Sequence, residues 1–139
     1  MLALMVLATV VSPPPVGVGS TSPPIHVVDP DGLDWQPAAD LPGAEVAVVD
    51  GQLDRAHVAY VRVPGGWGLR SHWHGNALRL IVLRGAVRLQ EPGRAALTLP
   101  SEGFAEIPAY LPHTLRCADA NGCTIAMQQS WAFDIVYTE

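Results

Sequence analysis

Short apolar stretches alternate with turn residues along most of the chain after residue 25. Alternation of apolar and polar positions is typical of strands with one buried face, and Asp-Gly, Pro-Gly and Asn-Gly pairs mark the turns between them. No segment there shows a helical period over ten or more residues. The pattern predicts about nine strands, at residues 44–49, 57–63, 78–83, 86–90, 96–99, 103–107, 114–117, 123–129 and 133–137. Regularly spaced short strands indicate an all-β sandwich or barrel.

The N-terminal residues have a different character. Met1 to Val11 form an apolar stretch interrupted only by Thr9, too short to span a bilayer, which needs about 20 residues. The stretch fits the hydrophobic region of a secretory signal peptide, although no basic residue precedes it. An upstream start, a retained anchor and a mis-assigned start codon stay open.

Residues 12–24 are rich in Pro, Gly and Ser and are typical of a linker. We therefore expect a leader and linker over residues 1–24 and one β-barrel domain over residues 25–139. The expected location is secreted or periplasmic, with the cytoplasm as the alternative. No membrane span is expected.

Composition supports a folded core. The chain has 139 residues, of which 49% are hydrophobic and 15% charged, with 13 Pro and 13 Gly. This length suits one domain, and the high hydrophobic content with few charged residues is not typical of intrinsic disorder. The formal net charge is -5, and all eight basic residues are Arg. The sequence shows no basic patch, so nucleic acid is not an expected partner.

Two cysteines bracket a turn. Cys117 and Cys123 enclose Asn121-Gly122, a strong hairpin signal that could bring the two sulfurs together. An exported protein would oxidise such a pair, whereas two free buried thiols are the alternative. Both stay open from the sequence. A zinc site made by this pair alone is not expected, because structural zinc takes four ligands.

The segment His72-Trp73-His74 carries the most informative chemistry. In an extended strand, residues i and i+2 share a face and lie about 7 Å apart, so both imidazoles can approach one ion while Trp73 packs on the opposite side. His113 follows His74 by 39 positions and could supply a third imidazole from another strand. Three neutral imidazoles suit iron, zinc, nickel or copper better than magnesium.

The surroundings of these histidines resemble the first cupin motif. That motif reads Gly, five residues, His-x-His, three or four residues, Glu, six residues, Gly. The chain matches it with Gly66, His72, His74 and Gly85, whereas Leu78 takes the place of the Glu.

A later stretch resembles the second cupin motif, whose core is Pro-x-Gly-x-x-His. Here it appears as Pro108 to His113, with Tyr110 in place of Gly. The leading Gly103 is one residue closer to the Pro than usual, and Cys117 takes the later Asn position. The flanking segments 33–35, 42–44 and 131–137 are similar to those of small single-domain bacterial cupins.

The resemblance implies an antiparallel double-stranded β-helix, or jelly-roll barrel, with a divalent transition metal on His72, His74 and His113. Cupins with a three-histidine variant of the motifs include iron-dependent dioxygenases, so iron is favoured if the protein is an oxygenase. The resemblance also implies a homodimer. A metal-dependent enzyme acting on a small organic molecule is the first hypothesis. A non-catalytic module that binds a small molecule or a metal is the second, and a metal-free scaffold is the third.

Other residues are weaker candidates. Leu78, Tyr110 and Arg79 are candidates for the pocket, although no catalytic residue is identified. Arg79 or Arg70 could hold an acidic substrate, with a surface role as the favoured alternative. Glu106 could orient a ligand imidazole, with a solvated surface charge as the favoured alternative.

Two histidines lie outside both motifs. His26 and His57 are expected on the surface or in hydrogen-bonded core positions, and not as metal ligands.

Overall fold

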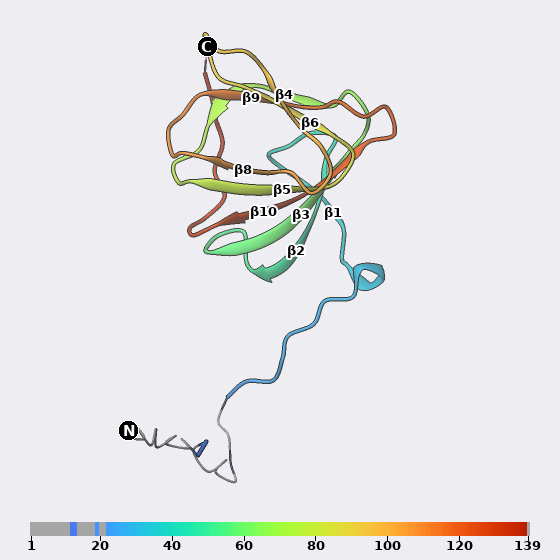
Figure 1. Ribbon diagram of the computed structural model, residues 1–139, viewed down its shortest axis with the longest axis vertical. Coiled ribbons are helices and arrows are strands. Elements are labelled where there is room, and N and C mark those ends of the chain that lie inside the picture. Colours follow the sequence, from blue (N-terminus) through green and yellow to red (C-terminus); the bar gives the residue numbers. More distant parts are fainter. Residues whose placement is uncertain (1–11, 14–18, 20–21, 139) are drawn as a thin grey trace, which may run out of the picture.

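The computed structural model describes residues 12–13, 19 and 22–138 and contains two antiparallel sheets (Figure 1). The six-stranded sheet has the order β1-β2-β3-β10-β5-β8, and the five-stranded sheet has the order β11-β4-β9-β6-β7. The strands are β1 Gln36–Pro37, β2 Glu45–Gly51, β3 His57–Val63, β4 Gly68–Trp73, β5 Leu78–Arg84, β6 Val87–Gln90, β7 Leu97–Leu99, β8 Phe104–Ile107, β9 His113–Cys117, β10 Cys123–Gln129 and β11 Val136–Tyr137. The predicted all-β double-sheet barrel is confirmed.

Strand alternation builds the core between the two sheets. In β3, every second residue from His57 to Val63 is buried, and β10 repeats this pattern from Cys123 to Gln129. These strands pair along their whole length, so their apolar side chains form a continuous inner row. The inner faces of β4 and β9 close the barrel from the opposite sheet.

Strand β4 is absent from the nine predicted strand ranges. Its residues begin at Gly68 and include Arg70 and Ser71, so hydrophobic alternation is weak, and only His72 is fully buried. The prediction that His72 and His74 share one face had assumed that residues 72–74 form an extended strand. The structure shows this strand up to Trp73. The predicted strand at 133–137 shortens to β11, Val136–Tyr137, because the preceding residues form a loop over the barrel end.

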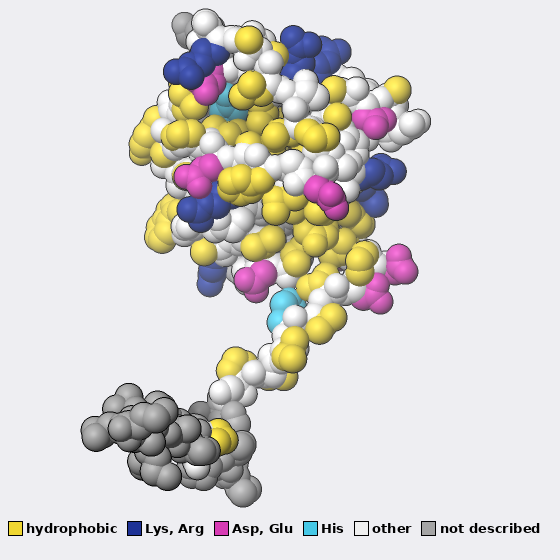
Figure 2. All heavy atoms as spheres, viewed as in Figure 1, with side chains coloured by type: hydrophobic (Ala, Val, Ile, Leu, Met, Phe, Trp, Pro, Cys, Tyr) yellow, Lys and Arg dark blue, Asp and Glu magenta, His cyan; other side chains and the backbone are white. Residues whose placement is uncertain are grey.

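A 3-10 turn, η1 at Pro30–Gly32, is the one helical element among the described residues. No helix in that part of the chain is long and apolar enough to cross a membrane. The segment before η1 runs away from the barrel, and Ile25 and Val27 on it are exposed (Figure 2). The predicted signal sequence lies almost wholly outside the described residues, and the boundary at residue 25 stays a prediction.

The two cysteines form a disulfide. Cys117 ends β9 and Cys123 begins β10, with a Cα–Cα distance of 5.8 Å. Both residues are buried in the core, and the turn between them contains Gly122 with a positive φ of 92°. The bridge therefore fastens the β9–β10 connection, which joins the two sheets.

Reduction of this disulfide should destabilise the protein. Closing a loop of this length lowers the entropy of the unfolded chain, which corresponds to about 2 kcal/mol of unfolding free energy. Urea denaturation with and without a phosphine reductant measures the difference. The Cys117→Ala/Cys123→Ala variant serves as the control, because reductant should leave its midpoint unchanged. An equal midpoint for reduced and oxidised wild type would contradict the prediction.

Candidate metal centre

Three imidazoles meet inside the barrel. His72 lies near the end of β4, His74 directly follows that strand, and His113 begins β9. His72 and His113 are paired across the β4–β9 ladder. One ring nitrogen from each of the three residues lies within 4.8 Å of the others. All three side chains are buried, as the resemblance to cupins had implied.

Trp73 lies on the opposite side of β4 from its two neighbours. Its ring packs 5.3 Å from the ring of Tyr110, centroid to centroid. The expected packing role of Trp73 is therefore confirmed. This contact leaves the inner face of the strand end to His72 and His74.

A backbone carbonyl orients each imidazole. Nδ1 of His72 donates to the carbonyl of Arg70 at 2.7 Å, and Nδ1 of His113 donates to that of Leu111 at 2.9 Å. Nδ1 of His74 donates to the carbonyl of Asp134 at 2.5 Å. Because Nδ1 carries the proton in each ring, Nε2 keeps its lone pair. This is the arrangement in which histidine binds a metal and its other nitrogen is fixed by a hydrogen bond.

The buried Nε2 of His113 makes no hydrogen bond within residues 22–138. A buried polar atom without a partner costs free energy, so such atoms in native proteins call for a physical explanation. An ion shared with the two neighbouring imidazoles would satisfy this lone pair. The residues present thus fit a divalent transition metal.

Burial lowers the pKa of two of the three imidazoles. Desolvation lowers the pKa of His72 to about 4, although its hydrogen bond to Arg70 acts in the opposite direction, and the nearby His113 and His74 lower the pKa further. Desolvation also lowers the pKa of His113. Both rings are therefore unprotonated at neutral pH, which is the form that coordinates a metal.

This shift predicts a pH dependence of the metal-free protein. A histidine whose pKa is lower in the folded state stabilises the fold at pH values above its unfolded pKa of about 6.5. That contribution is lost as the pH falls toward the folded pKa of about 4. The shift at His72 alone corresponds to about 3 kcal/mol of unfolding free energy over the full titration, and the shift at His113 acts in the same direction.

Chemical denaturation in chelator from pH 7.5 to pH 5 tests this prediction. The wild type should lose stability across this range, and His72→Gln should lose clearly less. His26→Gln, which alters an exposed histidine outside the cluster, should follow the wild type. Parallel curves for wild type and His72→Gln would show that His72 does not titrate as expected.

The cluster lines a small apolar cavity of about 50 Å³. Its other walls are contributed by Leu41, Val61, Trp67, Leu69, Leu78, Leu80, Leu115, Ile125, Met127 and Phe133. Leu78, which stands where the resembled motif has Glu, is 6% exposed and faces this cavity. No carboxylate lines this cavity.

The other predicted pocket residues lie elsewhere. Arg79 points outward and forms an exposed ion pair with Glu106 at 3.0 Å, so neither residue reaches an imidazole. Arg79 therefore has the surface role that the sequence favoured and does not lie at the pocket, because it follows inward-facing Leu78 and takes the opposite face of β5. Glu106 likewise is a surface charge, the alternative that the sequence had favoured.

Tyr110 is 66% exposed and does not line the cavity, so the prediction that it lies in the pocket is also wrong. It occupies the motif's Gly position, and its backbone keeps the positive φ, 64°, that normally favours glycine. Its amide donates to the carbonyl of His74 at 2.8 Å. Tyr110 thus contacts the outer side of the segment that carries the histidines.

Asp134 is the main site residue that the sequence did not indicate. Besides its carbonyl contact to His74, its carboxylate accepts a hydrogen bond from the amide of Gly75 at 2.7 Å. A Cβ on Gly75 would approach this carboxylate oxygen to 2.7 Å, so a larger residue there would have to displace the Asp134 side chain. A carbonyl that acts across 60 positions of sequence leaves no residue-type signal, so no motif could have found it.

The remaining histidines lie outside the cluster, as predicted. His26 is exposed near the carbonyl of Val49, and His57 is buried on β3 with Nδ1 bonded to the carbonyl of Arg55. Gln129, the ladder partner of His57, is fully buried. Neither Nε2 of His57 nor the side-chain amide of Gln129 has a hydrogen-bond partner among the described residues.

Comparisons with known proteins agree with this architecture. The polyketide cyclase RemF from Streptomyces resistomycificus matches with a TM-score of 0.68 and 16% identity, over 83% of this chain and 86% of that chain. An RmlC-like cupin from Shewanella frigidimarina matches with a TM-score of 0.65 and 14% identity, over 80% and 95% of the two chains. The DMSP lyase DddQ from Ruegeria pomeroyi matches with a TM-score of 0.61 and 17% identity, over 76% and 61%.

No family model matches the sequence, and no curated protein matches it. The matched structures nevertheless include proteins named as cupins, which align over 63% and 80% of this chain. The chain therefore has the fold of the cupin superfamily and carries a cluster of three histidines inside its barrel.

Proposed function

We propose that the protein binds a divalent transition metal through Nε2 of His72, His74 and His113. The observation that carries this proposal is the shared geometry of three buried imidazoles, each fixed at Nδ1 by a backbone carbonyl. Rings held this way lose little conformational freedom when an ion binds. Iron, zinc, nickel and copper all suit an imidazole set without a carboxylate.

We propose further that the bound metal supports turnover of a small organic molecule, with dioxygenase chemistry as the first reaction to test. A metal held by three protein ligands keeps positions open and can polarise a substrate or activate oxygen. Leu78 supplies no charge, so an anionic substrate would find a more positive centre than in a site containing Glu. The similar structures include proteins named as a polyketide cyclase and a DMSP lyase, so this fold carries enzymes.

Metal analysis of the natively purified protein is the first test. About one equivalent of iron, zinc, nickel or copper is expected, and its identity selects the reactions to examine. After anaerobic loading with ferrous iron, oxygen uptake can be followed with diketones, thiols and 2-oxo acids. Uptake with none of these classes at full iron loading would overturn the dioxygenase proposal while leaving metal binding intact.

The small cavity favours a second candidate, a binding module without turnover. A volume of about 50 Å³ holds an ion and one or two water-sized molecules, and is well below the 300–1,000 Å³ of a pocket for a drug-sized ligand. A binding module should gain thermal stability with its ligand and yield no new product by mass spectrometry. Product formation distinguishes the two candidates directly.

We also propose export of the protein to an oxidising compartment. The disulfide between Cys117 and Cys123 supports this location, because such bonds persist outside the reducing cytosol. Fractionation of the native host, followed by mass measurement of the mature chain, tests export together with leader removal. Recovery of the uncleaved chain from the cytosol would overturn the proposal.

A homodimer is the proposed assembly. Strand β8 is a sheet edge, and Phe104 on it lies opposite Ile81 of β5, with both side chains exposed. Figure 2 shows hydrophobic side chains gathered across the middle of the barrel. Sedimentation analysis should give twice the chain mass for the wild type and a smaller species for Phe104→Asp. A monomeric wild type at micromolar concentration would contradict the dimer.

A further inference from the structure

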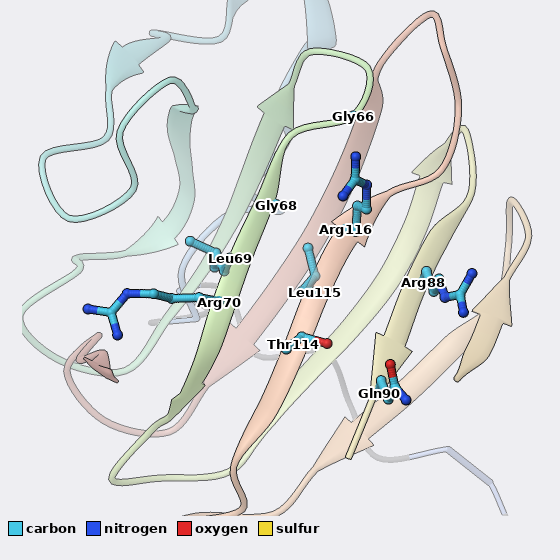
Figure 3. A pocket seen from close by; sticks show the side chains of 9 residues that line it. All are labelled: Gly66, Gly68, Leu69, Arg70, Arg88, Gln90, Thr114, Leu115 and Arg116. Atoms are coloured by element: carbon cyan, nitrogen blue, oxygen red, sulfur yellow. The ribbon is translucent and has the colours of Figure 1, made fainter. Parts of the chain in front are cut away.

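The outer face of the five-stranded sheet carries a cationic groove of about 670 Å³. Figure 3 shows Arg70 on β4, Arg116 on β9 and Arg88 on β6, spread across three neighbouring strands. Gln90 and Thr114 extend the same face with neutral polar side chains. None of the residues that line the groove is acidic.

The three arginines of the groove form no ion pair with a carboxylate of the described residues. Four of the eight arginines, Arg55, Arg62, Arg79 and Arg94, each pair with a carboxylate. Of the other four, none has a carboxylate partner in the part of the chain that the structure describes, and three lie in this groove. Such clustering is unexpected for a chain with a net charge of -5. The sequence predicted no basic patch because these residues are far apart along the chain.

The sheet register places two like charges side by side. Arg88 and Arg116 are direct partners across the β6–β9 ladder, and the next residue in that row, on β4, is Gly68. Like charges directly opposite each other destabilise a sheet. The arrangement therefore does not serve stability of the isolated fold, and an anion between the two guanidinium groups would remove the repulsion.

Two glycines lie beside Arg116. A Cβ on Gly68 would lie 3.1 Å from the carbonyl of Leu115 and 3.5 Å from Cγ of Arg116. A Cβ on Gly66 would lie 3.9 Å from Nη2 of Arg116. Figure 3 shows the Arg116 side chain extending toward Gly66.

Arg70 is fixed at the other side of the groove. Its Nη1 donates to the carbonyl of Thr138 at 2.9 Å, and its guanidinium lies 4.3 Å from the ring centroid of Tyr137. A guanidinium held in this way keeps further N–H donors for a ligand. Figure 3 shows the Arg70 side chain extending away from Arg88 and Arg116, so these two arginines are the cations that one small ligand would engage together.

We propose that this groove binds a small anion with two or more acidic groups, carboxylate or phosphate. Guanidinium groups recognise both kinds of group through paired N–H donors. The volume of the groove lies within the range typical of small-molecule sites. This site is separate from the imidazole cluster, which lies on the inner face of the same strands, and it does not depend on metal binding.

Titration calorimetry of the full chain at low ionic strength tests the proposal with two probes, citrate and pyrophosphate. At least one should bind with a dissociation constant below 1 mM, set as an order-of-magnitude threshold. Tighter binding of citrate would identify carboxylates as the preferred groups, and tighter binding of pyrophosphate would identify phosphates. Affinity should fall as sodium chloride is raised, because the groove is open to solvent.

Arg88→Glu/Arg116→Glu should weaken binding at least tenfold, since two charge-assisted contacts become repulsive. Arg84→Glu is the matched control, because Arg84 is an exposed arginine on β5, also without a carboxylate partner among the described residues, and outside the groove. This control should keep wild-type affinity. Arg88→Gln/Arg116→Gln, which avoids new charge, should weaken binding several-fold and should not lower the thermal midpoint.

Two results would overturn the proposal: no binding of either probe to the wild type at low salt, or equal weakening by Arg84→Glu and by the double variants. Cobalt binding to the imidazole cluster should be the same in the wild type and in Arg88→Gln/Arg116→Gln. This measurement separates failure of the groove from failure of the proposed metal centre.

Discussion

His72→Ala should abolish tight binding of cobalt or zinc, with at least a hundredfold loss of affinity. His72 occupies the centre of the cluster, with its ring centroid 4.2 Å from that of His113 and 5.1 Å from that of His74. Without it, the two remaining imidazoles make an incomplete site, and the other walls of the cavity are apolar. Cobalt absorbance in the visible region, titrated to saturation and checked by elemental analysis, gives the affinity and the stoichiometry.

The matched control for this experiment is His57→Ala. His57 is buried to a similar degree, and its Nδ1 contacts the carbonyl two residues before it, as in His72. The two substitutions therefore remove the same volume and the same local hydrogen bond. Only His72→Ala should lose the metal and the accompanying rise in thermal midpoint. Equal metal binding by both variants would show that His72 is not a metal ligand.

The sequence predicted the parts of this fold that depend on local pattern. Strands β3 and β10 alternate regularly between buried and partly exposed residues, so their positions followed from hydrophobicity alone. Strand β4 was missed because its glycine and polar residues hide that alternation. What makes it a strand is pairing with β9 and β11, which is a property of the whole fold.

The same distinction applies to the two sites. His72, His74 and His113 were predictable because spacing and residue type both point to coordination. The carbonyls that orient them, above all that of Asp134, carry no residue-type signal and depend on loop placement. The arginine groove was hidden for a related reason, since its cations come from three strands that only the sheet register brings together.

Leu78→Glu should destabilise the metal-free protein by about 2–4 kcal/mol, and metal should restore most of this loss. Leu78 lines the cavity and is only 6% exposed, so a carboxylate there would be desolvated in an apolar chamber. Burial raises the pKa of such a group and penalises its charged form. A bound divalent ion reverses the penalty, because it turns the carboxylate into a fourth ligand. Denaturation with chelator and with one equivalent of metal measures both effects.

Leu78→Gln separates charge from shape, because Gln has almost the same size and polarity but cannot ionise. Both variants should lose similar stability without metal. Only Leu78→Glu should bind metal at least tenfold more tightly than the wild type, with a relative gain for manganese and iron, which favour oxygen ligands. That outcome would locate the ion between the three imidazoles and Leu78, and would explain the neutral residue as a way to keep this direction free for substrate. Equal affinities for the two variants would place the ion elsewhere, so the cavity beside Leu78 would not be the reaction chamber.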